Sequence, residues 1–338
     1  MNMCKVAVLG AGSWGIALAK LLSTNKNEVT VWSALDDEIR MLNEKREHTD
    51  KLPGVKLPDE MIFTSDLKEA VKGKKVLVMA VPSPFIKSTA ASLKEFYTED
   101  QIIVNVAKGI EGDTLLTLSE VIEREIPGSN VAVLSGPSHA EEVGRGIPTT
   151  IVVAAKGKDT ALFLQNMFMN EVFRVYTSPD VRGVEIGAAL KNVIALAAGI
   201  ADGLGYGDNT KAALITRGMA EISRLGKAMG GRPETFYGLS GIGDLIVTCA
   251  SMHSRNRRAG ILLAQGKTLK EAQDEIKMVI EGANCAKAAK ALAAKYNVSM
   301  PIVEEVNKIL FENKAATDVV NELMLRDARI EIKADDWK

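Results

Sequence analysis

The chain of 338 residues is poor in the residues that build metal and disulfide sites. Its three cysteines lie far apart and form no CxxC pair, which excludes a disulfide framework and a cysteine-built zinc site. Its three histidines are too scattered for a histidine metal cluster, so we expect no metal. Charge of one sign is also lacking, because 42 Lys and Arg stand against 43 Asp and Glu. A net charge of −1 argues against generic binding to nucleic acid or to an acidic membrane.

Long apolar runs are missing as well. No run approaches the roughly 20 apolar residues that span a bilayer, and the most apolar stretch, Val193–Ala201, ends at Asp202. The first residues lack the length and flanks of a signal peptide and lead directly into a strand. We therefore expect a cytoplasmic protein without an integral membrane segment.

The length corresponds to about two domains, and 46% apolar with 25% charged residues is ordinary for a globular protein. In the first half, β-branched runs alternate with amphipathic segments, which predicts an α/β fold with a mainly parallel, doubly wound Rossmann-type sheet. After about Pro179, Ala-rich helical segments dominate and predict an all-helical domain. We expect a dinucleotide-binding domain over residues 1–180 and a helical substrate-binding domain over residues 181–338. The expected strands are Lys5–Leu9, Glu28–Trp32, Lys75–Val81, Gln101–Val106, Asn130–Leu134, Thr150–Ala154 and Val172–Tyr176. The expected helices include Gly15–Leu22, Asp36–Glu44, Ser83–Phe96 with Ser83 as N-cap, Val181–Ala201, Thr210–Met229, Arg255–Leu263, Cys285–Lys295, Ile302–Phe311 and Thr317–Arg329.

A glycine motif, GAGSWG over Gly10–Gly15, follows the first strand and opens a helix. A dinucleotide site needs one glycine for the tight turn, a second for close approach of the pyrophosphate and a third for helix–strand packing. Gly10, Gly12 and Gly15 fit these roles, and the helix N-terminus offers free N–H groups to the phosphates. A glycine turn without a ligand is the alternative.

The choice between NAD and NADP stays open from the residues alone. The group that reads the adenosine ribose is expected at the end of the second strand, yet residues 31–35 carry neither an acid nor an arginine. Asp36 is either that acid or a helix N-cap. The basic candidates for a 2′-phosphate are Arg40, Arg46 and Lys51. A solvated helix face is the alternative explanation for each of them.

Two further strand ends carry candidate groups. Lys108 follows the strand Gln101–Val106, at the sheet edge where ligands of open α/β folds bind. The segment Ser135–Ala140 follows another strand, and its small residues allow close approach of a ligand. Its His139 is a candidate base, although a surface or capping role is favoured. Each of these features is also compatible with a plain turn or a surface side chain.

Lys191 lies in an apolar helical segment, EIGAALKNVIALAAGIA. Its helical neighbours at three and four positions are small or apolar, and Asp202 returns to about the same face. Burial lowers the pKa of an ammonium group toward the range useful for proton transfer. The alternative is a lysine that snorkels at a domain interface.

A basic cluster begins at Ser254, a natural N-cap, which places Arg255 and Asn256 in the first turn of a helix. Cations there oppose the helix dipole, and a bound phosphate resolves the conflict. An RNA-binding helix face is the alternative. The segment GIGD, which ends at Asp244, precedes this cluster. The segment Val279–Gly282 interrupts the helical pattern and is a candidate to close a site, with a plain loop as the alternative.

Taken together, these residues closely resemble the bacterial-type NAD(P)-dependent sn-glycerol-3-phosphate dehydrogenase family. The matching motifs keep their order to about residue 325. They are GAGSWG at Gly10–Gly15, AKG at Ala107–Gly109, SGPSHAEE at Ser135–Glu142, LKNVIALAAGIADGLGYGDN at Leu190–Asn209, GIGDL at Gly241–Leu245, SRNRRAG at Ser254–Gly260 and VIEG at Val279–Gly282.

The resemblance implies reversible hydride transfer between NAD(P)H and carbon 2 of dihydroxyacetone phosphate, which supplies glycerophospholipid synthesis. It implies that Lys191 is the proton acceptor in alcohol oxidation and the donor in ketone reduction. The implied substrate contacts are Lys108, Gly136, Ser138, Lys191, Asp244, Ser254, Arg255 and Asn256. The implied cofactor contacts are Ser13, Trp14, Lys108, Ala140, Arg255, Val279 and Glu281, to which the glycine motif adds Gly10, Gly12 and Gly15.

The sequence departs from the family pattern at two positions. Ala34 stands where family members usually carry Arg or His for the 2′-phosphate, which leaves Lys51 or another basic residue to take that role. Ala188 stands where Gly is usual. The family also suggests a homodimer. The alternatives are a β-hydroxyacid or hydroxyacyl-CoA dehydrogenase, which shares this domain plan, and a nucleotide-binding redox sensor.

Overall fold

The structure is a computed structural model that describes residues 3–328 and residue 331. Within these residues the chain forms one eight-stranded sheet in the order β3-β2-β1-β4-β5-β6-β7-β8. Neighbouring strands are parallel except for β6 and β7, which are antiparallel. The strands are β1 (Lys5–Leu9), β2 (Glu28–Trp32), β3 (Ile62–Thr64), β4 (Val76–Met79), β5 (Ile102–Asn105), β6 (Asn130–Ser135), β7 (Thr149–Ala155) and β8 (Phe173–Ser178).

Helices cover both faces of this sheet, because its strands are apolar on both faces. In β1, Val6 and Val8 pack into one core cluster, whereas Ala7 and Leu9 pack into another on the opposite face. The first face is covered by α1 (Ser13–Thr24), α2 (Asp36–Lys45), α6 (Ala140–Gly144) and α7 (Lys158–Phe168). The second is covered by α3 (Leu67–Val71), α4 (Ile86–Leu93) and α5 (Leu118–Glu125), and the short η1 (Ser83–Phe85) leads into α4.

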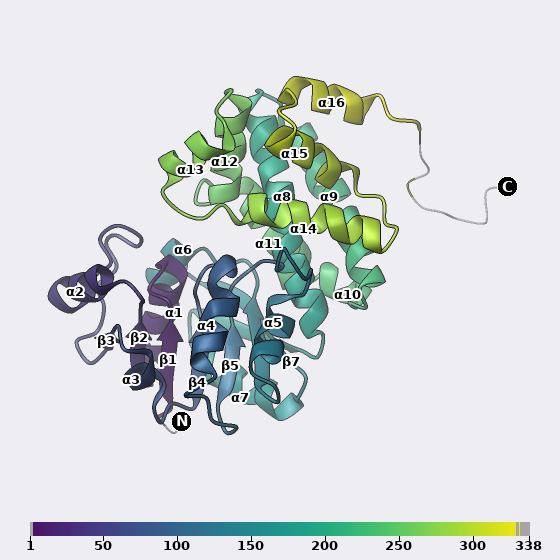
Figure 1. Ribbon diagram of the computed structural model, residues 1–338. Helices are drawn as coiled ribbons and strands as arrows, with labels where there is room; N and C mark the ends of the chain where they lie inside the picture. The colour runs from purple at the N-terminus through teal and green to yellow at the C-terminus, as the bar shows by residue number, and fades with distance from the viewer. Residues whose placement is uncertain (1–2, 329–330, 332–338) are drawn as a thin grey trace.

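The rest of the chain is helical and gathers above the sheet (Figure 1). Its centre is α8 (Val181–Gly203). The N-cap of α8 is Asp180, whose side chain accepts a hydrogen bond from the Gly183 backbone N–H. By length and composition α8 is long and apolar enough to cross a membrane, contrary to the expectation that no run approaches that length. Its apolar residues are, however, buried inside the protein. Around it lie α9 (Asp208–Ala228), α10 (Pro233–Phe236), η2 (Leu239–Gly243), α11 (Asp244–Ala250), α12 (Arg255–Ala264), α13 (Leu269–Ile276), α14 (Glu281–Lys295), α15 (Pro301–Phe311) and α16 (Ala316–Met324).

Small residues let α8 pack closely against α12. A Cβ added at Gly199 in α8 would lie 2.0 Å from the carbonyl oxygen of Arg257 in α12. The small Ala and Gly side chains of α8 therefore allow the backbone of α12 to approach closely. This packing places the start of α12 beside the middle of α8, where Lys191 lies.

The predicted fold class is confirmed, with some local differences. The three-residue strand β3 was not predicted, and α14 begins at Glu281 instead of Cys285. Ser83 is not an N-cap, because Pro82 takes that position. The expected helix Thr317–Arg329 is observed as α16, and Arg329 lies outside the described residues. The exact domain boundary at residues 180 and 181 stays a prediction.

Candidate active site

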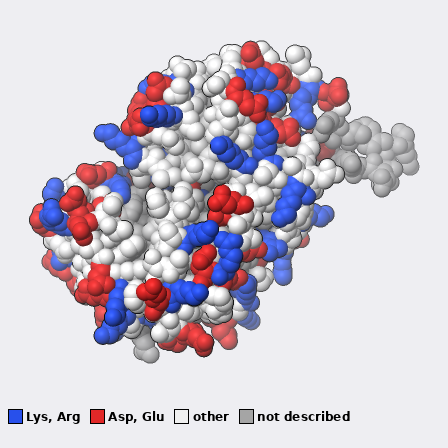
Figure 2. All heavy atoms as spheres, in the orientation of Figure 1, with Lys and Arg blue, Asp and Glu red and all other residues white. Residues whose placement is uncertain are grey.

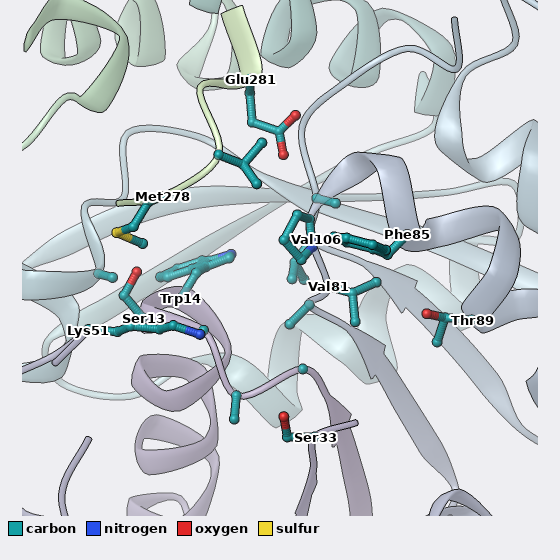
Figure 3. A pocket seen from close by; sticks show the side chains of 18 of the residues that line it. Ser13, Trp14, Ser33, Lys51, Val81, Phe85, Thr89, Val106, Met278 and Glu281 are labelled. Carbon is teal, nitrogen blue, oxygen red and sulfur yellow. The ribbon is translucent and has the colours of Figure 1, made fainter. Parts of the chain in front are cut away.

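A cavity of about 1090 Å³ lies at the carboxyl ends of the parallel strands, between the sheet and the helical part. It reaches from the end of β2 past the glycine loop to α8, α12 and the start of α14. Figure 3 shows Ser13, Trp14, Val81 and Glu281 around it. Lys/Arg and Asp/Glu side chains are interspersed over the visible face of the molecule (Figure 2), as the near-zero net charge predicts. The cavity thus lies at the carboxyl ends of the strands, which is where open α/β folds bind ligands.

The glycine loop has the geometry of a phosphate cradle. Gly10 has φ +121°, and a Cβ there would lie 2.7 Å from the backbone of Ala80. A Cβ at Gly15 would lie 2.0 Å from the Gly10 carbonyl oxygen, whereas a Cβ at Gly12 meets only open space. Gly12 caps α1 without a side-chain hydrogen bond, so the first N–H groups of α1 are free of a capping side chain. Among the described residues, the buried Nε1 of Trp14 has no partner, and these features together fit a dinucleotide.

Lys191 lies in the middle of α8 and is only 5% exposed. Its Nζ donates to Asp244 Oδ1 at 2.5 Å and to Thr248 Oγ1 at 2.7 Å. Burial lowers the pKa of Lys191 to about 7, against the opposing effect of the Asp244 carboxylate. Lys191 therefore exchanges protons near neutral pH, which is the property of a general acid and base.

Asp244 connects two lysines. It is 1% exposed, and its Oδ2 accepts from Lys108 Nζ at 2.7 Å. Burial alone would raise the pKa of Asp244, but the ammonium groups of Lys108 and Lys191 offset this and hold it below its usual range. Lys108 also donates to the carbonyl oxygen of Gly136 at 3.0 Å. The predicted residues of α8 and α11 and of the segments that follow β5 and β6 thus form one hydrogen-bonded chain.

The cluster at the start of α12 lies at the same cavity. Ser254 is the N-cap, as predicted, and its Oγ accepts from the Arg257 backbone N–H at 3.2 Å. Arg255 donates to the carbonyl oxygen of Val279 at 3.2 Å, and burial lowers its pKa. The Asn256 amide binds Asn192 Oδ1 and the Gly282 N–H, both at 2.9 Å. Asn256 therefore joins α8, α12 and α14, a contact that the sequence did not reveal.

Glu281 closes the cavity from the first residue of α14. Its Oε1 accepts from the Ser83 backbone N–H at 3.0 Å and its Oε2 from the Ser83 hydroxyl at 2.5 Å. Burial raises the pKa of Glu281, against the opposing effect of these hydrogen bonds. The two residues are 198 positions apart and join the sheet to the helical part.

Most of the predicted site residues line this cavity. Three of them do not line it among the described residues, namely Gly15, Gly136 and Asp244. His139 precedes α6 as its N-cap but makes no side-chain capping hydrogen bond. It lies in the cavity wall instead of on the surface, with its ring centroid 5.7 Å from that of His253, and burial lowers its pKa.

The adenosine end differs from the prediction. Asp36 is the first residue of α2 and not its N-cap, since Leu35 takes that position. Arg40 pairs with Asp37, and Arg46 donates to the Met61 carbonyl oxygen. Of the three basic candidates, Lys51 lines the cavity, together with Glu38, which was not predicted.

Comparisons with known proteins agree with this site. Two family models match, described as the N-terminus and the C-terminus of NAD-dependent glycerol-3-phosphate dehydrogenase, over residues 5–161 and 180–321. A glycerol-3-phosphate dehydrogenase [NAD(P)+] of Agathobacter rectalis is 62% identical over 99% of this chain and 100% of its own length. One of Fusobacterium nucleatum is 63% identical over 98% of this chain and 100% of its own length. The crystal structure of glycerol-3-phosphate dehydrogenase from Coxiella burnetii is 36% identical, with a TM-score of 0.93 over 96% of this chain and 99% of that one.

Proposed function

The chain belongs to the NAD-dependent glycerol-3-phosphate dehydrogenase family, and from this premise we propose that it reversibly reduces dihydroxyacetone phosphate to sn-glycerol 3-phosphate. It is an NAD(P)-dependent oxidoreductase with glycerol-3-phosphate dehydrogenase activity. The proposal concerns the direction of the reaction and the residues that carry it.

The observation that carries the proposal is the buried lysine Lys191, with a pKa of about 7, at the wall of a cavity that fits a dinucleotide. A reduced nicotinamide held in this cavity would supply the hydride for carbon 2. The Lys191 ammonium donates a proton to the carbonyl oxygen as that oxygen gains negative charge. In the reverse direction its neutral amine accepts the hydroxyl proton. Asp244 holds the ammonium in place, and Lys108 adds positive charge beside it.

We assign the phosphate of the substrate to the start of α12. Its N–H groups, the half-buried guanidinium of Arg255 and the amide of Asn256 meet there at the cavity wall. A helix N-terminus and a guanidinium both favour a phosphate dianion. The substrate contacts that we propose are Lys108, Gly136, Ser138, Lys191, Asp244, Ser254, Arg255 and Asn256. The proposed cofactor contacts are Gly10, Gly12, Ser13, Trp14, Gly15, Lys108, Ala140, Arg255, Val279 and Glu281.

We further propose a cytoplasmic homodimer that works in the direction of glycerol 3-phosphate and supplies glycerophospholipid synthesis. Helix α9 supports the dimer, because its first half exposes Ala212 and Ala213 beside the half-buried Leu214 and Ile215. Light scattering coupled to gel filtration tests the oligomeric state, and a mass near the 36.3 kDa of one chain contradicts it.

The role of Lys191 is tested by replacing it with alanine. Without the proton donor we expect turnover to fall by roughly two to four orders of magnitude while cofactor binding persists. Lys211→Ala is the matched control, since Lys211 is a half-buried lysine that, like Lys191, pairs with a carboxylate, here Asp202, and it does not line the cavity in the described structure. Near-normal turnover of Lys191→Ala removes the assignment.

A further inference from the structure

The end of β2 is where a Rossmann-type fold reads the 2′ position of the adenosine ribose. Ser33, Ala34 and Leu35 follow β2 and line the cavity there. The methyl group of Ala34 offers neither a hydrogen-bond acceptor for a 2′-hydroxyl nor a cation for a 2′-phosphate. The recognition of this position must therefore come from other side chains.

Two oppositely charged side chains reach this part of the cavity, Glu38 from α2 and Lys51 from the loop that follows it. They form an ion pair between Lys51 Nζ and Glu38 Oε1. The other carboxylate oxygen of Glu38 accepts from the Ser33 hydroxyl at 2.7 Å, and Ser33 Oγ accepts from the Leu35 N–H at 3.2 Å. The ion pair is thus tied directly to the segment that follows β2.

The two members of the pair differ in how they face the cavity. The Glu38 side chain is 12% exposed, and its two oxygens accept from Lys51 and Ser33, while His48 Nε2 lies 3.5 Å from Oε1. Burial alone would raise the pKa of Glu38, but the neighbouring His48, Lys51 and Ser33 groups lower it to about 2, so the carboxylate is ionised at neutral pH.

Lys51 is more open, with its side chain 32% exposed. An ammonium group has three N–H donors, and within the described residues Glu38 is the acceptor that Lys51 uses. Figure 3 shows the side chain extended into the pocket. Donors therefore remain for an anion in the cavity.

We propose that the Glu38–Lys51 ion pair sets the choice between NADP and NAD. Lys51 binds the 2′-phosphate, and the fixed negative charge of Glu38 opposes that phosphate without affecting a neutral 2′-hydroxyl to the same degree. The pair allows use of both cofactors: the positive charge of Lys51 favours NADP, and the negative charge of Glu38 favours NAD. The inference rests on nicotinamide dinucleotide use by the proposed enzyme and not on the identity of the triose.

The chain offers a matched control pair in the same region. Lys56 and Glu47 also form an ion pair, at 2.8 Å, and Glu47 is 14% exposed, close to the value of Glu38. Within the described structure neither lines the cavity. The variants are Lys51→Met and Glu38→Gln, with Lys56→Met and Glu47→Gln as controls.

The first readout is equilibrium binding of adenosine 2′,5′-bisphosphate and of 5′-AMP by calorimetry, which needs no turnover. A charged hydrogen bond corresponds to about a tenfold to hundredfold change in affinity, so we expect Lys51→Met to weaken the bisphosphate by that factor and 5′-AMP by about twofold or less. We expect Glu38→Gln to tighten the bisphosphate at least about threefold relative to 5′-AMP. The ratio of kcat/KM for NADPH and NADH is expected to move in the same directions.

The controls are expected to leave both ratios unchanged. An unchanged ratio in Lys51→Met, or a ratio that falls in Glu38→Gln, overturns the proposal. Lys51→Arg keeps the charge, so it is expected to retain bisphosphate binding and tests the proposal even where the Met variant folds poorly. If these ratios behave as expected but dihydroxyacetone phosphate is not reduced, the proposed substrate is wrong and the assignment of the ion pair stands.

Discussion

Asp244→Asn removes one charge from the centre of the site and changes little in volume. In the native protein this carboxylate lies between the ammonium groups of Lys191, at 2.5 Å, and Lys108, at 2.7 Å. With asparagine, two buried cations face each other without a negative charge between them. We expect Lys191 to lose its proton more readily.

The size of the effect follows from the pKa of Lys191. That pKa is already about 7 because of burial, and the Asp244 carboxylate is what opposes a lower value. An opposite charge at this distance shifts a pKa by about 1–3 units, so the pKa of Lys191 is expected to fall to about 4–6 in the variant. Ketone reduction needs the protonated lysine, which is about half of the native enzyme at pH 7, so the rate at pH 7 is expected to fall by about fivefold to five-hundredfold.

The direction of the pH shift distinguishes this effect from a loss of activity at every pH through structural disruption. In the native enzyme, reduction declines as the pH rises through about 7, whereas alcohol oxidation increases, because it needs the neutral amine. In Asp244→Asn both midpoints move to lower pH, and acidification recovers part of the lost reduction.

The assay is kcat/KM in both directions from about pH 5 to about pH 9. Asp202→Asn is the control. Asp202 lies in α8 and, like Asp244, pairs with two cations, Lys211 and Arg257, but it does not line the cavity among the described residues. A midpoint in Asp244→Asn that equals that of the native enzyme would refute the role of Asp244 in setting the protonation of Lys191.

Three further predictions follow from single contacts. Arg255→Met removes the half-buried guanidinium beside the proposed phosphate site, and steady-state kinetics are expected to show a KM for dihydroxyacetone phosphate raised about tenfold to a hundredfold. A change below about twofold contradicts the phosphate assignment. Gly199→Ala forces a methyl group against a backbone carbonyl oxygen and is expected to cost about 1–3 kcal/mol in urea unfolding, whereas Gly112→Ala, which meets open space, serves as its control. Ser83→Ala removes one of the two hydrogen bonds that the half-buried Glu281 carboxylate receives from Ser83, so the free energy of unfolding is expected to fall by about 1–3 kcal/mol. Equal stability in the same urea assay excludes a stabilising role for this contact.

The sheet and the glycine loop were predictable because their determinants are local. Strands such as β1 and β2 are β-branched runs with the boundaries that the sequence predicts, and Gly10 has the positive φ that the turn requires. The short strand β3 was not predictable in the same way. Its three residues, Ile62–Thr64, contain one buried side chain, and it forms because Thr30, Val31 and Trp32 of β2 offer a free edge.

The burial of Lys191 was predictable from helical periodicity, but its partner was not. Asp202, on about the same face of the helix, pairs with Lys211 and Arg257 instead. The partner Asp244 is 53 positions away in α11, and only the packing of α11 against α8 brings it near. No local sequence pattern predicts such a contact.

The same limit applies at both ends of the cavity. Glu281 and Ser83 meet across 198 positions, so the motif VIEG could be matched to the family without revealing what the carboxylate contacts. At the adenosine end, Glu38 is one acid among several in the acidic first turns of α2, and its role becomes visible only when Lys51 folds back onto it.

The most direct test of the proposed reaction is the oxidation of NADPH, and of NADH in parallel, with dihydroxyacetone phosphate as the sole acceptor. We expect turnover with at least one of the two cofactors, with glycerol 3-phosphate as product. Absence of turnover with both, in a protein that binds the cofactors measurably, contradicts the triose-phosphate assignment and favours a hydroxyacid dehydrogenase or a nucleotide-binding sensor.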